Sequence, residues 1–368
     1  MQNLETPALL LDERRMQHNI ERMQNRMNQL GVSFRPHVKT SKCLEVVRHQ
    51  MAEGAHGITV STLKEAEEFF RAGIEDILYA VAIVPNKLDH ALRLIRHGLR
   101  LTLLVESPAM AAQIARHGEQ HGICHEVMIE VDTDGHRSGI KPDDPLLLAT
   151  AAELRGGARL KGVMTHAGAS YDLNTPEALA QMAEQERLRC VAAAEKLRAA
   201  GYDCPVVSVG STPTALSARH LDGVTEVRAG VYVFFDLVMA EVGVCGIDDI
   251  AISVLCTVIG HRLDQNWIIT DGGWMAMSRD LGHQDHGYGL VCDADGKPVA
   301  GLGFGKANQE HGVLQWTGEG DIVERFPVGT SLRVLPNHAC ATGAQHTRYH
   351  VIPRKGGAWP VWQRFGGW

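Results

Sequence analysis

The fold is decided by residues 57–105, which read GITVSTLKEAEEFFRAGIEDILYAVAIVPNKLDHALRLIRHGLRLTLLV. Three short apolar runs, at 57–60, 77–81 and 101–105, are separated by two segments whose apolar residues recur every three or four positions. Short apolar runs are typical of buried strands, and the three-to-four spacing is typical of helices with one buried face. This stretch therefore predicts strand, helix, strand, helix and strand in succession.

The same alternation extends in both directions from this stretch. Counting from Val32, about eight apolar strands occur, most of them followed by a helix, and the later strands are predicted at 126–131, 160–165, 206–209 and 224–227. Apolar strands that alternate with amphipathic helices indicate a parallel sheet covered by helices. Eight units in roughly 220 residues fit a closed (β/α)8 barrel, whose chemistry lies at the C-terminal ends of its strands. An open doubly wound sheet is the alternative, but no GxGxxG turn follows the first strand.

The character of the sequence changes after about residue 240. Helical spacing gives way to β-branched runs separated by turns rich in Gly, Asp, Asn and Pro. These runs lie at 252–259, 267–270, 331–335 and 349–352. We therefore predict a barrel domain over residues 12–240 and a mostly antiparallel β domain over residues 241–368, which a strand from residues 1–11 joins.

Composition and charge narrow the class of protein. The chain has 368 residues with 45% hydrophobic and 21% charged residues, which is typical of a globular protein. A net charge of -7 argues against binding to nucleic acid or to an anionic membrane surface. No apolar run approaches the roughly 18 residues of a membrane span, and the first residues lack the layout of a signal peptide. Eight cysteines without a CxxC pair are typical of a reducing compartment, so we expect a cytoplasmic protein.

Three candidates for chemistry follow predicted strands of the barrel. Lys39 lies in RPHVKTSK, where barrel walls can desolvate an amine and leave it able to react with a carbonyl group. Arg137, in DTDGHRSG, suits an anionic oxygen, and His166, in THAG, can lie against a flat ligand. Taken singly, each has a plainer interpretation: a solvated lysine, an ion-paired arginine and a hydrogen-bonded structural histidine.

Two turns of small residues follow the last two predicted strands of the barrel. They read SVGSTPT at 208–214 and RAGVY at 228–232. Barrels of this kind commonly bind phosphate there, through backbone N–H groups and hydroxyls. Each turn alone predicts only a turn. Together with a lysine at an earlier strand end, they describe a phosphate clamp opposite an amine, which is the arrangement that pyridoxal phosphate needs.

A further candidate lies in the predicted β domain, in PNHACATG at 336–343. On an extended segment, His338 and Cys340 would point to the same face. An imidazole and a thiolate suit zinc, and two protein ligands suffice for a catalytic ion that completes its shell with water or substrate. Without further support, a buried cysteine beside a structural histidine is the simpler interpretation.

Taken together, the motifs resemble the fold-type III pyridoxal-phosphate enzymes, which pair an alanine-racemase-like barrel with a C-terminal β domain. Within them the chain is similar to the metal-dependent branch of D-serine dehydratases and D-threonine aldolases, over essentially its whole length. The motifs that carry the resemblance stand in the expected order: RPHVKTSK, GITVSTLKEAE, DTDGHRSG, SVGSTPTA, TEVRAGVYVFFD, NQEHG and PNHACATG.

The resemblance implies a role for each candidate residue. It implies Lys39 as the catalytic base and as the lysine that binds pyridoxal 5'-phosphate covalently. The other cofactor contacts that it implies are Arg137 at the phenolic oxygen, His166 near the ring, Arg228 facing the pyridine nitrogen, and Ser211, Thr212, Gly230 and Val231 around the phosphate. It also implies His338 and Cys340 as ligands of a divalent metal; the thiolate favours zinc, and manganese, cobalt and magnesium stay open. We expect Tyr171, Gln309, Glu310 and His311 to line the substrate site, and the family pattern implies a homodimer.

The resemblance also implies an activity. A carbon–oxygen lyase of this branch removes water from a D-β-hydroxy amino acid, such as D-threo-3-hydroxyaspartate or D-serine, and yields a 2-oxo acid and ammonia. Aldolases of the branch generally show His-x-Asp where this chain has His338 and Cys340, and this difference favours dehydration. The alternative is a D-threonine aldolase, which cleaves its substrate to glycine and an aldehyde. An amino acid racemase would not need the two ligands, and a non-catalytic carrier of pyridoxal phosphate would lack the second domain.

Overall fold

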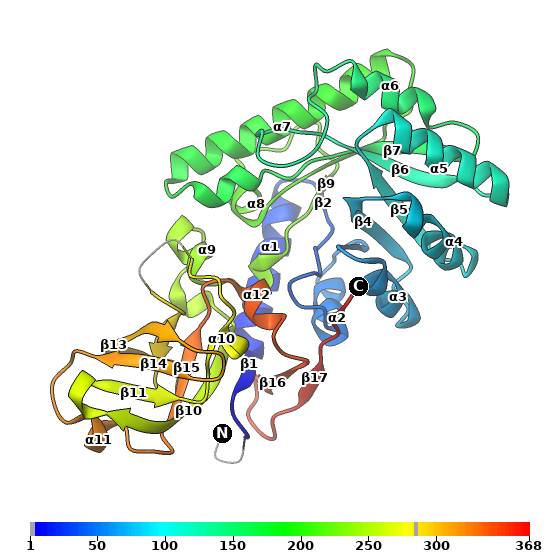
Figure 1. Ribbon diagram of the computed structural model, residues 1–368. Coiled ribbons are helices and arrows are strands. Elements are labelled where there is room, and N and C mark those ends of the chain that lie inside the picture. Colours follow the sequence, from blue (N-terminus) through cyan, green and yellow to red (C-terminus); the bar gives the residue numbers. More distant parts are fainter. Residues whose placement is uncertain (1–3, 283–285) are drawn as a thin grey trace. The chain divides into compact units, whose positions relative to one another are not determined.

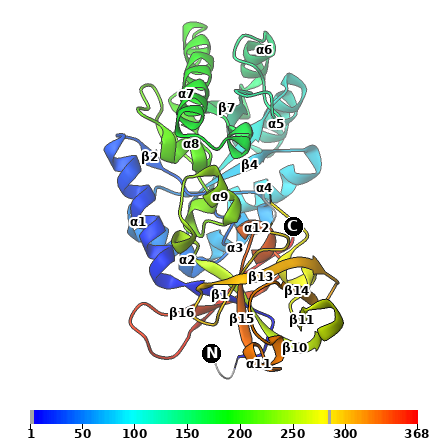
Figure 2. The same ribbon diagram turned by 90° about the vertical axis from the view of Figure 1, so that its left-hand side faces the viewer.

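A computed structural model describes residues 4–282 and 286–368 of the chain (Figure 1 and, turned by 90°, Figure 2). The chain divides into two compact units. The barrel unit comprises Glu21–Gly230 with the last two residues, and the β unit comprises the chain up to Ile20 together with Val231–Gly366. The sequence pattern puts the domain boundary after residue 240, whereas the two units divide after Gly230.

The barrel unit is built on a parallel sheet of eight strands in the order β2-β9-β8-β7-β6-β5-β4-β3. Past the end of β2 the chain runs beside β3: Thr59 N–H donates to Pro36 O over 2.8 Å, and Val38 N–H donates to Thr59 O over 2.9 Å. These two bonds join the ends of the sheet, and the predicted (β/α)8 barrel is confirmed. The strands are β2 Ser33–Phe34, β3 Ile58–Val60, β4 Asp76–Ala82, β5 Arg100–Val105, β6 His125–Glu130, β7 Ala158–Met164, β8 Val206–Val209 and β9 Glu226–Val227.

Apolar side chains from neighbouring strands fill the inside of the sheet. Leu78, Leu104, Met128 and Met164 come from four consecutive strands and form one buried cluster, each at most 2% exposed. Burying such side chains stabilises the fold by about 1.5–3 kcal/mol each. The layer below the strand ends is therefore a packed core, and only the residues beyond the C-terminal ends of the strands are available for chemistry.

Helices connect the strands, and capping side chains set where several of them begin. Ser107 accepts a hydrogen bond from Met110 N–H at the start of α5, and Thr175 accepts one from Ala178 N–H at the start of α7. Figure 1 shows α4, α5 and α6 along one side of β5, β6 and β7. The helices are α1 Glu13–Gln29, α2 Leu44–Ala52, α3 Leu63–Arg71, α4 Leu88–Arg96, α5 Pro108–His121, α6 Leu146–Glu153, α7 Pro176–Ala199 and α8 Thr212–Ser217, with the 3-10 helices η1 Pro85–Lys87 and η2 Gly168–Asp172.

The β unit holds a nine-stranded sheet in the order β11-β14-β13-β12-β15-β10-β1-β16-β17. Because β10 also pairs with β11, six of these strands form a closed ring. The N-terminal strand β1 extends the sheet, antiparallel to β10 and parallel to β16, and residues 1–3 of the predicted strand lie outside the described residues. The strands are β1 Ala8–Asp12, β10 Ile252–Arg262, β11 Trp267–Thr270, β12 Leu290–Cys292, β13 Pro298–Ala307, β14 Gly312–Trp316, β15 Ser331–Leu335, β16 Arg348–Ile352 and β17 Val361–Gln363.

Short helices interrupt the strands of the β unit. They are α9 Leu237–Val242, α10 Trp274–Met277, α11 Ile322–Arg325 and α12 Ala339–Gly343, with the 3-10 helices η3 Val231–Val233, η4 Ile247–Asp249 and η5 Leu263–Gln265. The predicted mostly antiparallel β region is confirmed, since β1 and β16 form its one parallel pair among the described strands. None of the helices in residues 4–282 and 286–368 combines the length and the apolar character that a membrane span needs.

Candidate active site

Lys39 lies in a tight turn just beyond β2, at the C-terminal mouth of the barrel. Lys42 N–H donates to Val38 O over 2.8 Å and closes the turn around Lys39. Lys42 has a φ of 43°, and its Nζ lies 3.0 Å from Oε1 of the buried Glu65. Lys42 therefore has a left-handed backbone conformation, which is more usual for glycine, and its ion pair with the first turn of α3 stabilises it. The turn is fixed on both sides of Lys39, whose own side chain is half-buried.

The charge of Lys39 acts on two imidazoles at the same end of the barrel. Burial, followed by the nearby Lys39 ammonium, lowers the pKa of His166 to about 3. The same two causes lower the pKa of His37 well below its usual range, and Arg228 adds to the effect. Both rings are therefore neutral at pH 7. The positive charge of this end of the barrel comes from lysine and arginine, which suits an anionic ligand.

Hydrogen bonding orients His166. Its Nδ1 lies 3.1 Å from Gly210 O, so Nδ1 carries the proton of the neutral ring and donates it to that carbonyl group. The ring of Tyr171, which is part of η2, lies 6.0 Å from the His166 ring between centroids, at an angle of 48°. The structure therefore places two residues of the predicted site next to one another.

Arg228 is buried and held in place by uncharged groups. Its Nε donates to Ser208 Oγ over 3.1 Å, and a second nitrogen donates to Thr165 O. Ser208 Oγ donates in turn to Glu226, which forms a 2.7 Å ion pair with Arg35. Burial lowers the pKa of the Arg228 guanidinium, and the nearby Glu226 opposes this shift. The side chain is fixed and cannot leave its position without breaking this network.

The two predicted phosphate-binding turns allow the backbone to approach other groups closely. A Cβ on Gly210, whose φ is +129°, would lie 2.2 Å from Arg228 O. A Cβ on Gly230 would lie 3.0 Å from His37 O and 3.2 Å from Thr40 Oγ1. Position 210 therefore requires glycine, and a side chain at position 230 would crowd its neighbours. The second turn lies directly beside the turn that carries Lys39.

Ser211, Thr212, Val231 and Arg137 complete the predicted cofactor set. Ser211 accepts from Thr214 N–H at the start of α8 and shares a 2.8 Å hydrogen bond with Ser170 Oγ. Thr212 is fully buried, and Val231 begins η3 in the β unit. Arg137 is 54% exposed, lies 3.5 Å from Glu130 Oε1, and contributes to the low pKa of His166.

These residues of the barrel unit fit pyridoxal phosphate, the cofactor that the resemblance implies. Lys39 offers an amine to the aldehyde group of the cofactor. Arg137 offers positive charge to an anionic oxygen of the cofactor, and it lies at the same end of the barrel as Lys39 and Arg228, since all three act on His166. Gly230 leaves room where a side chain would press on the Lys39 turn.

Glu186 also positions the site, a role that was not predicted from the sequence. This carboxylate of α7 is buried, and its Oε1 accepts from Ala167 N–H over 3.1 Å and from Gly210 N–H over 2.9 Å. It thereby ties the segment after β7, which carries His166, to the turn after β8. Burial raises the pKa of Glu186. The signal in the sequence is an acid on the buried face of α7, between Ala183 and Cys190.

In the β unit, the expectation of an extended His338–Cys340 segment is wrong. His338 has extended dihedral angles, with φ -136° and ψ 106°, but α12 begins at the next residue, so Cys340 lies in its first turn. The two side chains nevertheless interact, because the Cys340 thiol is a hydrogen-bond partner of the His338 ring. The proximity comes from a turn at the start of a helix and not from strand alternation.

Asp280 orients His338 and was also missed. Its Oδ2 lies 2.7 Å from His338 Nδ1, and this bond, followed by Cys340, raises the pKa of His338 to about 11. Asn337 Nδ2 donates to Asp280 O over 3.1 Å and holds the aspartate segment in place. A metal would displace the proton of Nε2, while the carboxylate keeps its bond to Nδ1, as is usual for ligating histidines. The donor set of imidazole and thiol therefore fits a divalent ion.

The remaining predicted residues of the β unit are exposed. Gln309, Glu310 and His311 lie in the turn between β13 and β14. Their backbone anchors α10, since Met275 N–H donates to Gln309 O over 3.1 Å. Their lining role stays a prediction.

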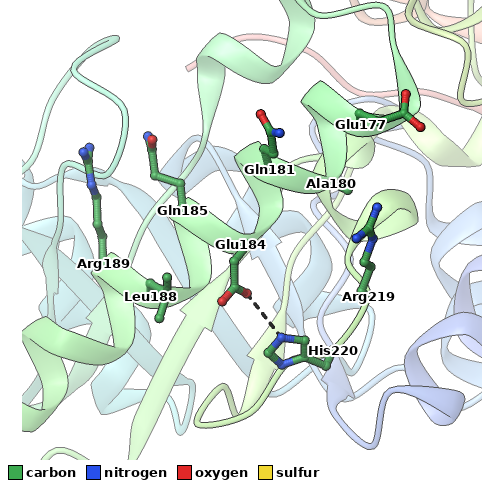
Figure 3. A pocket seen from close by; sticks show the side chains of 9 residues that line it. All are labelled: Glu177, Ala180, Gln181, Glu184, Gln185, Leu188, Arg189, Arg219 and His220. Carbon is green, nitrogen blue, oxygen red and sulfur yellow. Dashed lines mark ion pairs between the residues drawn. The ribbon is translucent and has the colours of Figure 1, made fainter.

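A separate hollow of about 580 Å³ lies along α7, and Figure 3 shows its lining side chains. Its two potentially reactive groups, Glu184 and His220, form an ion pair over 3.5 Å. The other lining residues are Glu177, Ala180, Gln181, Gln185, Leu188, Arg189 and Arg219. The hollow contains none of the predicted site residues, which lie instead at the C-terminal end of the barrel strands or in the β unit.

Comparison with known proteins identifies the class to which this fold and these residues belong. Residues 11–238 match the family described as the N-terminal domain of alanine racemase, and residues 251–352 match a serine dehydratase domain. The chain therefore belongs to the family of proteins with an alanine racemase N-terminal domain, and it carries a serine dehydratase domain in addition.

Individual relatives narrow the comparison further. The chain is 60% identical over 374 residues to D-threo-3-hydroxyaspartate dehydratase of Delftia sp. (strain HT23), covering 99% of this chain and 98% of the relative. It is 31% identical to D-serine dehydratase of Dictyostelium discoideum, covering 95% and 94% of the two chains. The solved structure of a cysteine-to-alanine mutant of D-threo-3-hydroxyaspartate dehydratase, in the metal-free form, is 59% identical and superposes with a TM-score of 0.97 over 100% of this chain and 99% of its own. The resemblance predicted from the motifs is confirmed.

Proposed function

We propose that this protein is a carbon–oxygen lyase that depends on pyridoxal phosphate and a divalent metal. It would remove water from a D-β-hydroxy amino acid, with D-threo-3-hydroxyaspartate as the preferred substrate and D-serine as the second candidate. The products would be a 2-oxo acid and ammonia. The observation that carries this proposal is the 60% identity, over 99% of the chain, to a D-threo-3-hydroxyaspartate dehydratase.

In the barrel unit, Lys39 would bind the cofactor and then accept the Cα proton of the substrate at its Nζ. Pyridoxal phosphate, when bound, supplies an electron sink that weakens the Cα–H bond of an attached amino acid. His166, whose low pKa makes it a weak base, would pack near the ring without competing for that proton. Arg228 would face the pyridine nitrogen, held there by Ser208 and Thr165.

In the β unit, His338 and Cys340 would hold the metal, and the thiolate favours zinc. A divalent ion, when bound, supplies a Lewis acid that stabilises a departing hydroxide. Asp280 would hold Nδ1 of the His338 ring, so that Nε2 binds the metal once its proton is displaced. A histidine-to-alanine mutant of the related dehydratase has also been solved, and its substituted histidine lies two positions before the cysteine of the metal-free mutant. His338 and Cys340 have the same spacing.

The proposal is tested by supplying the purified protein with three substrates separately. We expect oxaloacetate and ammonia from D-threo-3-hydroxyaspartate, and slower release of pyruvate and ammonia from D-serine. Glycine and acetaldehyde from D-threonine, without ammonia from the other two substrates, would overturn the proposal in favour of the D-threonine aldolase alternative.

We further propose that the protein is a cytoplasmic homodimer. The family pattern supports the dimer, and the eight cysteines support a reducing compartment because none of them forms a disulfide in the described part of the chain. Light scattering on the eluted protein should give twice the chain mass of 40.2 kDa. A mass of one chain would contradict the dimer.

A further inference from the structure

A cluster of side chains that can bind a metal lies on the helices of the barrel unit, and it includes none of the predicted cofactor or metal residues. His117 and His121 are four residues apart on α5, so both side chains lie on one face of the helix. Their ring centroids are 4.4 Å apart. Asp89, on the adjacent helix α4, places its Oδ1 3.2 Å from His117 Nε2. One ligand atom from each of the three residues lies within 4.8 Å of the other two.

The hydrogen bonds of His121 leave the appropriate nitrogen of its ring for a metal. His121 Nδ1 lies 2.8 Å from His117 O, so it carries the ring proton and donates to that carbonyl group. His121 Nε2 then keeps its lone pair. A ligating histidine is oriented in this way in most metal sites, by a bond from its other ring nitrogen to a carbonyl group or carboxylate.

His117 is oriented by a third histidine. His125 lies on β6 beneath the cluster, is fully buried, and places its Nε2 3.0 Å from His117 Nδ1. The two ring nitrogens share one proton, so this contact fixes the orientation of the His117 ring. A metal at this position would replace the proton that His117 Nε2 donates to Asp89 Oδ1.

The hydrogen-bond network of these residues is not closed. His125 Nδ1 has no hydrogen-bond partner among the described residues, although it is buried. If His125 accepts at Nε2, its proton must lie on this unpaired Nδ1. An unpaired buried polar group costs about 1–3 kcal/mol, so packing alone gives no reason for this arrangement.

We propose that Asp89, His117 and His121 form a second metal site, which takes a divalent transition ion such as Zn²⁺. Two imidazoles and one carboxylate suit zinc and its neighbours, whereas calcium and magnesium prefer oxygen ligands alone. Asp89 has a side chain 79% exposed, so the remaining coordination position is open to water. The ion would join α4 to α5 and stabilise the outer helices of the barrel. This site is independent of the proposed function, because it shares no residue with the His338 and Cys340 pair.

The test measures how many zinc ions bind per chain in four forms of the full-length protein, namely the wild type, Cys340→Ala, Asp89→Ala and His97→Gln. Each form is first treated with a chelator and then titrated with Zn²⁺. We expect two equivalents per chain in the wild type and one in Cys340→Ala. Asp89→Ala should also bind one equivalent, and its thermal midpoint should rise less with zinc than that of the wild type. His97→Gln, which alters another exposed histidine near the end of α4, should behave as the wild type does.

Asp89 is an exposed residue, so its substitution is expected to leave the fold and the lyase turnover within about twofold of the wild type. A second variant, His121→Gln, should lose the same equivalent. The site is refuted if both variants bind as much zinc as the wild type and show the same zinc-dependent rise in thermal midpoint. Failure of the proposed function would show instead as absent turnover, with the Asp89-dependent equivalent still present.

Discussion

The amine of Lys39 is the group on which the proposed chemistry depends. After burial, its charge is the next cause of the lowered pKa of two half-buried histidines, His37 and His166, so it lies within electrostatic range of both rings. We expect Lys39→Ala to lower turnover by about 10²–10⁴-fold, the usual contribution of a positioned acid or base. The variant should also lose the absorbance of covalently bound cofactor. Lys64→Ala removes a surface lysine paired with Glu68 and should leave both properties unchanged. A Lys39→Ala protein that keeps its absorbance would contradict the assignment.

His166 makes the stability of the folded chain depend on pH. Its folded-state pKa of about 3 lies below the ordinary value of 6.5, so the unfolded chain binds more protons between these two values. Stability contributed by His166 is therefore present above pH 6.5 and is lost as the pH falls. Between pH 7 and pH 5 the loss should be about 2 kcal/mol in the free energy of unfolding.

Urea unfolding of the wild type and of His166→Asn at the two pH values isolates this contribution. Asparagine can still donate to Gly210 O, the present partner of the ring. The other histidines are common to both proteins and cancel in the difference. Equal losses in the two proteins between pH 7 and pH 5 would show that His166 titrates normally in the folded state.

Glu186 joins helix α7 to the segments that follow β7 and β8. Glu186→Ala would leave Ala167 N–H and Gly210 N–H buried without their acceptor, at a cost of about 1–3 kcal/mol each. We expect lower thermal stability and a raised dissociation constant for pyridoxal phosphate. Glu186→Gln keeps an acceptor oxygen and should restore most of both. If the alanine variant binds the cofactor as the wild type does, the two turns are positioned by other contacts.

Asp280 has the corresponding role in the β unit. Asp280→Ala should lower the affinity of the metal that His338 and Cys340 would hold by about 10–100-fold, since it removes the partner of His338 Nδ1. Calorimetric titration with Zn²⁺ in an Asp89→Ala background measures this site without the second one. Asp264→Ala, which removes an exposed carboxylate paired with Arg262, is the matched control. Unchanged affinity would show that Asp280 does not support the ligand.

Local signals in the sequence predicted the elements where one pattern dominates. Helix α5 follows the strand predicted at 101–105, as the alternation of strands and helices predicts; Ser107 caps its start, and Gly122, with a φ of 66°, ends it. Helix α6 was not predicted: it reads LLLATAAE and offers no polar face to set a helical period. Helix α2 was not predicted either, and its Cys43 at the N-cap makes no capping bond.

Some residues of the candidate site could likewise be predicted from local motifs, whereas others could not. Lys39 and His338 could be found because each stands in a local motif. Glu186 and Asp280 could not, since their partners lie 24 and 58 residues away along the chain and only the folded barrel or sheet brings them together. The helical start at Ala339 was missed because Asp236, more than a hundred residues earlier, accepts from its backbone N–H over 2.8 Å.

In the proposed reaction the cofactor residues come mainly from the barrel unit, and the metal ligands come from the β unit. The two contributions are chemically separable, because Lys39 and the phosphate-binding turns contain no residue of the proposed metal pair. Removing the metal with a chelator should therefore abolish turnover of D-threo-3-hydroxyaspartate while the absorbance of bound cofactor persists. Zn²⁺ should restore turnover, since hydroxide is a poor leaving group without a Lewis acid.

The Asp89→Ala background makes this last test specific. With the second site removed, a single equivalent of zinc should restore full turnover to the chelator-treated protein. Cys340→Ala in the same background should keep the cofactor absorbance, and zinc should fail to restore its activity. Turnover that survives complete removal of metal would refute metal assistance, and the lyase would then have to eliminate water through residues of the barrel unit alone.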